Sequence, residues 1–260
     1  MKKKLLMLIT AGLCIMSMVV FTACDKNADA EEPTEATEAT SPTEATEEMP
    51  DKVITDSAYD PVIAKYQEVE KNGFQASEED IYHVDMEGSG EYDGTDGVIN
   101  GMLLEDLQGM EGAHIYYALY DINNDTCDEL LIGGGDSPET ARLYDIFTFD
   151  EGAALRIIPG NIQLGYRTNG QILNSGVVEV IFSGGAASTA YAFLEIPSDD
   201  IRLKTVTMLS YEGDPGDPDA PADYHDGPDL ENEITEEDFN KILDDYEGAG
   251  AVTPDWQPVV

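Results

Sequence analysis

The stretch AHIYYALYDINNDTCDELLIGGGD, residues 113–136, contains two short apolar runs on either side of an acidic turn. Residues 116–120 are aromatic or aliphatic, and residues 130–132 are aliphatic. Short runs rich in such side chains and separated by Asn and Asp are typical of paired β-strands. We therefore expect strand, tight turn and strand here, and we expect the folded part of the chain to be built around this hairpin.

Acidic and amide side chains recur through the turn. Asp121, Asn123, Asp125 and Glu129 are its first, third, fifth and ninth residues. Alternate side chains of a tight turn converge on one point, and their oxygens suit a hard cation such as Ca²⁺. The turn resembles the loop D-x-[DN]-x-D-G-x-x-[DE]-[LI] of FG-GAP and VCBS-type repeats, which bind Ca²⁺ between two strands. The resemblance implies those four side chains and the Cys127 carbonyl as ligands.

The resemblance covers about fifteen residues and a single copy, so it does not imply a β-propeller. The sixth position, Gly in the repeats, is Thr126 here. The turn needs positive φ at this position, which strains a β-branched residue. The position of the bidentate glutamate of an EF-hand is Ile132, so a site would be completed differently. The alternative is a hydrated acidic turn that binds no ion.

Helical and strand-like patterns flank the hairpin. Apolar spacing predicts helices over residues 60–72, 98–107 and 235–247, the last capped by Thr235. Further strands are expected at 142–150, 154–158, 162–167, 171–174, 177–182, 189–196 and 203–211. Residues 133–135 are expected to be a flexible glycine turn, residues 212–233 an exposed acidic loop, and Trp256 to dock on the core. The prediction is an α+β fold: an antiparallel meander flanked by N-terminal helices and one C-terminal helix.

The first 52 residues predict export and anchoring. Residues 2–4 are lysines, residues 5–21 are almost wholly apolar, and small residues precede Cys24, so residues 1–23 are expected to be a signal peptide. The ending resembles a bacterial lipobox, with Phe21 where Leu is usual, which implies diacylglycerol on Cys24. An ordinary cleaved signal is the alternative. Residues 24–52 repeat Thr, Glu, Ala and Pro, which predicts a disordered linker before one domain at 53–260.

Charge and cysteine content narrow the partners. The formal net charge is −41, with 54 acids against 13 Lys and Arg. Nucleic acid is therefore an unexpected partner, and attachment to a membrane is expected through lipid alone. Cys127 is the one cysteine beyond residue 24, which excludes an internal disulfide in the mature chain and argues against structural zinc. We expect a monomeric domain.

The sequence singles out no catalytic residue. The segment 183–188 contains serines, but no nucleophile-elbow motif links them to His114 or His225. The tyrosines at 116–120 are expected to be half-buried, the alternative being a sugar-stacking platform. The layout also resembles small lipoproteins of Gram-positive bacteria to which no activity is assigned. The leading hypothesis is a non-catalytic surface module for a protein or glycan; a hydrolase of envelope or dietary polymers and a solute receptor are the alternatives.

Overall fold

The computed structural model describes residues 56–82, 97–185, 187–213 and 222–260. The predicted signal segment, Cys24 and the linker at 24–52 lie outside these ranges.

The described residues form three α-helices and eleven β-strands. The helices are α1 (Asp60–Lys71), α2 (Gly101–Gln108) and α3 (Glu236–Glu247). The strands are β1 (His114–Tyr120), β2 (Glu129–Gly135), β3 (Arg142–Asp150), β4 (Ala153–Arg156), β5 (Thr168–Ile172), β6 (Val178–Gly185), β7 (Ser188–Glu195), β8 (Lys204–Glu212), β9 (Asp223–Gly227), β10 (Asn232–Ile234) and β11 (Gln257–Pro258). The predicted α+β class is confirmed.

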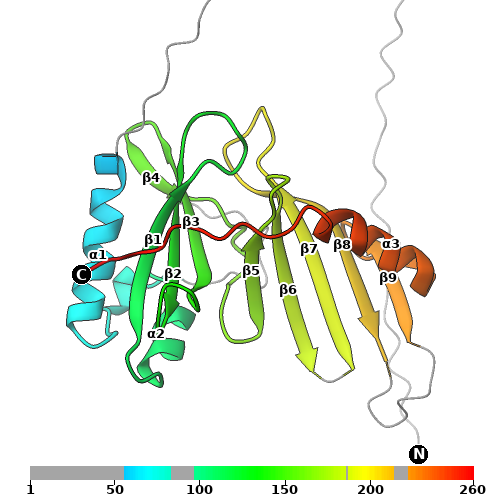
Figure 1. Ribbon diagram of the computed structural model, residues 1–260, viewed down its shortest axis with the longest axis horizontal. Helices are drawn as coiled ribbons and strands as arrows, with labels where there is room; N and C mark the ends of the chain where they lie inside the picture. Colours follow the sequence, from blue (N-terminus) through cyan, green and yellow to red (C-terminus); the bar gives the residue numbers. More distant parts are fainter. Residues whose placement is uncertain (1–55, 83–96, 186, 214–221) are drawn as a thin grey trace, which may run out of the picture. The chain divides into compact units, whose positions relative to one another are not determined.

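Every strand pair is antiparallel, and the sheet follows the order β10-β9-β8-β7-β6-β5-β3-β2-β1-β11, with β4 on the edge of β3 (Figure 1). The order runs mostly with the chain, as in a meander. One joint in it is thin, because β3 and β5 share the single residue pair Leu143 and Gly170. A side chain at Gly170 would meet Leu164 at 2.7 Å and Leu143 at 3.3 Å, so glycine permits these two leucines to pack against β5 here.

Both faces of the central hairpin are buried. Ile115 and Ile132 lie in a core with α1 and α2, whereas Tyr116 and Leu131 lie in a core with residues of β5 to β7. A third core forms between β7 to β9, the turn that joins β5 to β6, and α3, where Phe239 is buried. Every residue of β2 is therefore buried, which explains why its sequence is apolar after Glu129 rather than alternating.

Helix caps follow the sequence closely. The Asn100 side chain accepts a hydrogen bond from Met102 N at 2.9 Å at the start of α2, and Thr235 accepts one from Asp238 N at 3.1 Å at the start of α3. Each cap satisfies a backbone N–H that has no partner within the helix. Because Asn100 is the cap, α2 begins later than residue 98, and the predicted helix start was wrong.

Three other sequence expectations were wrong. Residues 133–135 are not a flexible turn but the end of β2. Residues 162–164 belong to no strand, and 165–167 form a turn closed by reciprocal backbone hydrogen bonds of 2.9 and 3.1 Å between Gly165 and Thr168. The segment expected as an acidic loop at 212–233 contains β9 and β10. Among the tyrosines at 116–120, Tyr116 is buried and its neighbours are partly buried, so they offer no open stacking platform.

The C-terminal segment, residues 249–260, returns from α3 across the sheet to β1 (Figure 1). Val252 N donates to Ile172 O at 2.7 Å beside β5, and Val259 N donates to Ile115 O at 3.1 Å beside β1. Trp256 lies between these two anchors and is 7% exposed. The expected docking of Trp256 on the core is confirmed, and it places the indole ring beside the thin joint between β3 and β5.

Candidate functional site

The acidic turn is held by its own side chains. The two oxygens of Asp121 accept hydrogen bonds from Asp125 N at 3.1 Å and from Thr126 N at 2.9 Å. Asp125 in turn accepts from Cys127 N at 2.8 Å, and Asn123 accepts from Asp125 N at 3.2 Å. The first three predicted ligand side chains therefore lie close together, because they accept hydrogen bonds from neighbouring backbone N–H groups of the same turn.

The backbone of the turn is strained where the repeats have glycine. Thr126 has φ +74° and Asn124 has φ +59°. Asn tolerates this region, but a β-branched residue there costs on the order of 1–3 kcal/mol. The sequence argument that this position demands positive φ is confirmed.

Glu129, the fourth predicted ligand side chain, is 2% exposed. Its oxygens accept hydrogen bonds from Ile122 N at 3.0 Å and from the Thr148 hydroxyl at 3.3 Å. Burial, with a smaller contribution from the nearby Asp125 and Asp121 carboxylates, raises the pKa of this carboxyl to about 7. Glu129 therefore already serves the hairpin by joining the start of the turn to β3.

The residues of the turn fit a Ca²⁺ ion in part. Asp121, Asn123 and Asp125 supply clustered oxygens of the right kind. Among the residues that the structure describes, no three His, Cys, Asp or Glu side chains are grouped so as to hold a metal ion. A hollow of about 490 Å³ adjoins the turn, lined by Asn123 and Asp125 and by Asp199 and Asp200 of the β7–β8 loop. The sequence alone does not predict that the β7–β8 loop lies beside the turn, because some 75 residues separate the two segments.

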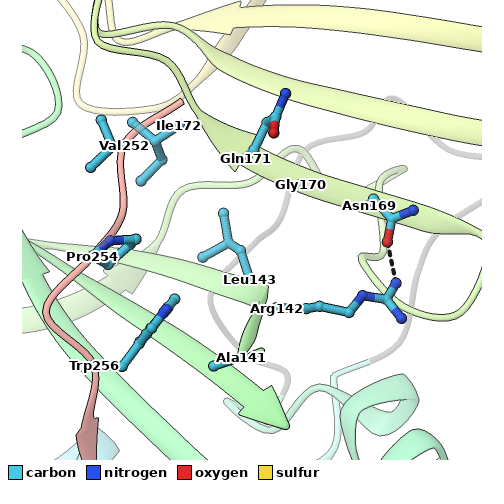
Figure 2. A pocket seen from close by; sticks show the side chains of 10 residues that line it. All are labelled: Ala141, Arg142, Leu143, Asn169, Gly170, Gln171, Ile172, Val252, Pro254 and Trp256. Carbon is cyan, nitrogen blue, oxygen red and sulfur yellow. Dashed lines mark hydrogen bonds between the residues drawn. The ribbon is translucent and has the colours of Figure 1, made fainter. Parts of the chain in front are cut away.

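A second concave site lies at the thin joint of the sheet. Its volume is about 230 Å³, and its lining comes from the start of β3, from β5 and from the C-terminal segment. Figure 2 shows its residues: Ala141, Arg142, Leu143, Asn169, Gly170, Gln171, Ile172, Val252, Pro254 and Trp256. We call it the joint pocket. The sequence does not reveal it, because three distant segments form it and none carries a motif.

The joint pocket has an apolar end and a polar end (Figure 2). Ile172, Val252, Pro254 and Trp256 form the apolar end. The indole ring packs on Gly133 of β2, where an added side chain would approach it to 2.9 Å. The glycine at 133 is thus what admits the tryptophan to this position.

Arg142 organises the polar end. Its Nη2 donates to Gly165 O at 2.9 Å and to the Asn169 side chain, and its guanidinium lies 5.8 Å from the centre of the Tyr144 ring. In the described ranges these are its interactions, and none is with a carboxylate. Lys65, Lys204 and Arg156 pair with Asp80, Asp200 and Asp145, whereas Lys71, Arg167, Arg202 and Lys241 resemble Arg142 in having no ion pair within the described residues.

Carboxyl groups suited to proton transfer lie elsewhere. Burial raises the pKa of Asp145 to about 6 although Arg156 Nε lies 2.9 Å from its Oδ1, and burial also raises the pKa of Glu179. Neither these two nor Glu129 lines the joint pocket. Its ten lining residues include no acid, histidine, serine or cysteine, so they offer binding groups rather than a general acid, base or nucleophile.

The histidines considered in the sequence are placed apart. His114 lies 2.8 Å from Glu70 at the edge of β1. His225 lies opposite Ser210 and Glu233 in the neighbouring strands. In the described part of the chain, no side-chain hydrogen bond joins His225 to either residue. The serines at 183 and 188 are not in register with His225.

Comparison with known proteins yields no match to a protein family, to a curated protein or to a solved structure. Within the described residues, no helix is long and apolar enough to cross a membrane.

Proposed function

We propose that this protein is a lipid-anchored, extracytoplasmic binding module that holds its ligand in the joint pocket without transforming it. The observation that carries this proposal is the composition of the pocket. It combines an apolar end closed by Trp256 with a small set of polar side chains, namely Arg142, Asn169 and Gln171. Concave sites of this composition are the usual form of small-ligand sites in proteins. Its lining lacks the groups that a hydrolase needs, which favours binding over catalysis.

The test is a screen of the full chain against arrayed glycans and peptides, followed by titration of each hit. Trp256 is the only tryptophan, so its fluorescence reports directly on the pocket. A Val252→Phe variant fills the apolar end, and Val206→Phe, on an exposed position of β8, is its matched control. Hits that bind wild type and Val206→Phe but not Val252→Phe support the proposal. Hits indifferent to Val252→Phe, in a variant that melts normally, would contradict it.

Anchoring through lipid at Cys24 is part of the proposal, and the lipobox-like residues before that cysteine support it. Two acyl chains give stable attachment, since each buried methylene contributes about 0.8 kcal/mol. Expression in a bacterium fed labelled palmitate should label the wild-type chain and Cys14→Ser, but not Cys24→Ser. Label retained by Cys24→Ser would overturn the anchor.

We further propose that the acidic turn takes up Ca²⁺ and that the ion stabilises the hairpin. Asp121, Asn123 and Asp125 would hold it, with the Cys127 carbonyl and Glu129 completing the set implied by the sequence resemblance. An ion bound only by the folded state at a Kd of about 10 μM would add roughly 2.7 kcal/mol of stability at 1 mM.

The structure dictates how the ion must be tested. Alanine at Asp121 would remove hydrogen bonds to Asp125 N and Thr126 N and so unravel the turn with or without Ca²⁺. The double variant Asp121→Asn with Asp125→Asn removes the charges and keeps one acceptor oxygen at each position, so it disturbs the hydrogen bonds of the turn less than alanine does. Its melting temperature should no longer rise in 1 mM Ca²⁺ relative to chelator. The control, Asp244→Asn with Asp245→Asn on the exposed side of α3, should keep the rise. If the melting temperature of wild type does not rise in Ca²⁺, the proposal that the turn binds the ion is wrong.

A further inference from the structure

We propose that the joint pocket and the neighbouring turn at residues 165–168 recognise an acidic sugar residue, that is, a pyranose ring bearing one carboxylate. The inference deepens the proposed binding function and rests on it. It is supported by the chemistry at the polar end of the pocket and by one exposed aromatic residue, Tyr166, in the turn that Arg142 contacts.

Arg142 supplies the charge. The chain has 54 acids and 13 Lys and Arg, so carboxylate partners for a guanidinium are abundant. Even so, Arg142 is exposed and bonds only to neutral oxygens of Gly165 and Asn169 in the described structure, both through Nη2. These bonds fix the plane of the guanidinium and leave Nε and Nη1 to donate. Because both parallel-bond arrangements of a guanidinium use Nη2, a carboxylate would accept one charge-assisted hydrogen bond from the remaining Nη1 or Nε, which is stronger than a hydrogen bond to a neutral oxygen.

The turn at 165–168 supplies the ring surface. Tyr166 is 70% exposed, which is the highest value among the large hydrophobic side chains of the described residues. The turn that carries it is fixed, because its two ends, Gly165 and Thr168, exchange backbone hydrogen bonds and Gly165 O accepts from Arg142. Tyr166 directly follows Gly165, whose carbonyl accepts from Arg142, and an exposed phenol ring suits a sugar, whose C–H face packs on an aromatic ring.

The remaining polar groups suit hydroxyls. Asn169 and Gln171 lie on β5 along the pocket. The Asn169 oxygen accepts from Arg142 and Gln171 Nε2 donates to Glu179, which leaves a donor on Asn169 and an acceptor on Gln171 for a ligand. Sugar hydroxyls both donate and accept, whereas the carboxylate is satisfied by Arg142. The cavity of about 230 Å³ has room for a small ligand group and not for a long chain.

The net charge of the protein decides between one carboxylate and many. With a net charge of −41, the protein repels every charged group of a polyanion that lies along its surface. At physiological ionic strength the screening length is about 8 Å, so a single carboxylate at Arg142 experiences mainly its nearest neighbours. The chemistry therefore favours an isolated acidic residue in an otherwise neutral glycan over a densely charged polymer.

The experiment compares two sugars that differ only at one carbon. Methyl β-D-glucuronide and methyl β-D-glucoside are titrated against the full chain, with Trp256 fluorescence and saturation-transfer NMR as readouts. Wild type should bind the glucuronide at least tenfold more tightly. Arg142→Gln should bind the two sugars alike, and Arg202→Gln, outside the pocket, should behave as wild type. Tyr166→Ala should weaken both sugars by the same factor. Thermal melts establish that each variant is folded.

The outcomes separate this inference from the proposed function. Equal binding of the two sugars to wild type would overturn the acidic specificity, and so would a glucuronide preference that survives Arg142→Gln. If neither sugar binds while other ligands depend on Val252 in the array screen, the acidic-sugar inference fails and the binding function stands. If no ligand depends on Val252, both fail.

Discussion

Glu129 shows how one buried carboxyl couples the hairpin to pH. Its side chain links Ile122 N to Thr148 inside the protein, where an ionised carboxylate is poorly solvated. The pKa is raised to about 7 from 4.5 mainly by that burial. Between those two values the folded protein holds a proton that the unfolded chain has lost. The free energy of unfolding must therefore fall as pH rises from about 4.5 to about 7.

Glu129→Gln removes this titration and keeps an oxygen that accepts from Ile122 N. Each pKa unit corresponds to 1.36 kcal/mol, so the rise from 4.5 to about 7 should make the variant more stable than wild type by about 3 kcal/mol above pH 7. Below pH 4.5 the two proteins should differ little. Urea unfolding at pH 4.5, 6 and 8 measures the difference. Asp145 titrates in both proteins and cancels in the comparison. Parallel curves at all three pH values would show that Glu129 is not the titrating group.

At the scale of elements, the end of β2 is where backbone and side-chain packing meet. Gly133 lies under the indole ring of Trp256, and Gly134 lies under Leu103 of α2. Glycine is used here for close approach rather than for flexibility. Both layers, the helix on one face and the C-terminal segment on the other, depend on the absence of side chains at adjacent residues of one strand.

Gly133→Ala should destabilise the protein by about 1–3 kcal/mol, because the new methyl group would lie 2.9 Å from the Trp256 ring. The ring must move, so its fluorescence should change as well. Gly109→Ala is the control, since an added side chain there meets nothing within 4 Å. Denaturant unfolding followed through Trp256 gives both readouts. An unchanged midpoint and spectrum would mean that the C-terminal segment yields without cost.

Sequence reasoning succeeded for elements whose signal is local. A few adjacent residues were enough to predict the end of the first helix near Asn72, the cap at Thr235, the hairpin and the positive φ at Thr126. It failed where distant residues decide. From the sequence alone, the three glycines of β2 predict a turn, because nothing nearby in the sequence shows that Trp256 packs on this strand. Strand β9 contains Asp and Gly, which are depleted in strands, and it forms because β8 offers an edge. The joint pocket combines segments more than 100 residues apart, so no local pattern could predict it.

At the scale of the whole molecule, the charge of −41 acts against the compact state. Folding concentrates like charges, and only a few are offset by ion pairs such as that of Lys204 with Asp200 at 2.6 Å. Such exposed pairs contribute little individually. The dominant electrostatic effect on stability is thus repulsion spread over the surface, which dissolved salt screens.

The melting temperature should therefore rise by about 3–8 °C between 10 and 300 mM KCl, because the screening length falls from about 30 Å to about 6 Å over that range. Choline chloride should act equally, since screening does not depend on the identity of the cation. Calcium separates the two effects: 1 mM Ca²⁺ added in 300 mM KCl should still raise the melting temperature if it occupies the acidic turn, whereas 1 mM Mg²⁺ should not. A rise that disappears in 300 mM KCl would assign calcium to screening and leave the turn as a hydrogen-bonded cap. A melting temperature indifferent to KCl would show that repulsion is not what limits the stability of this fold.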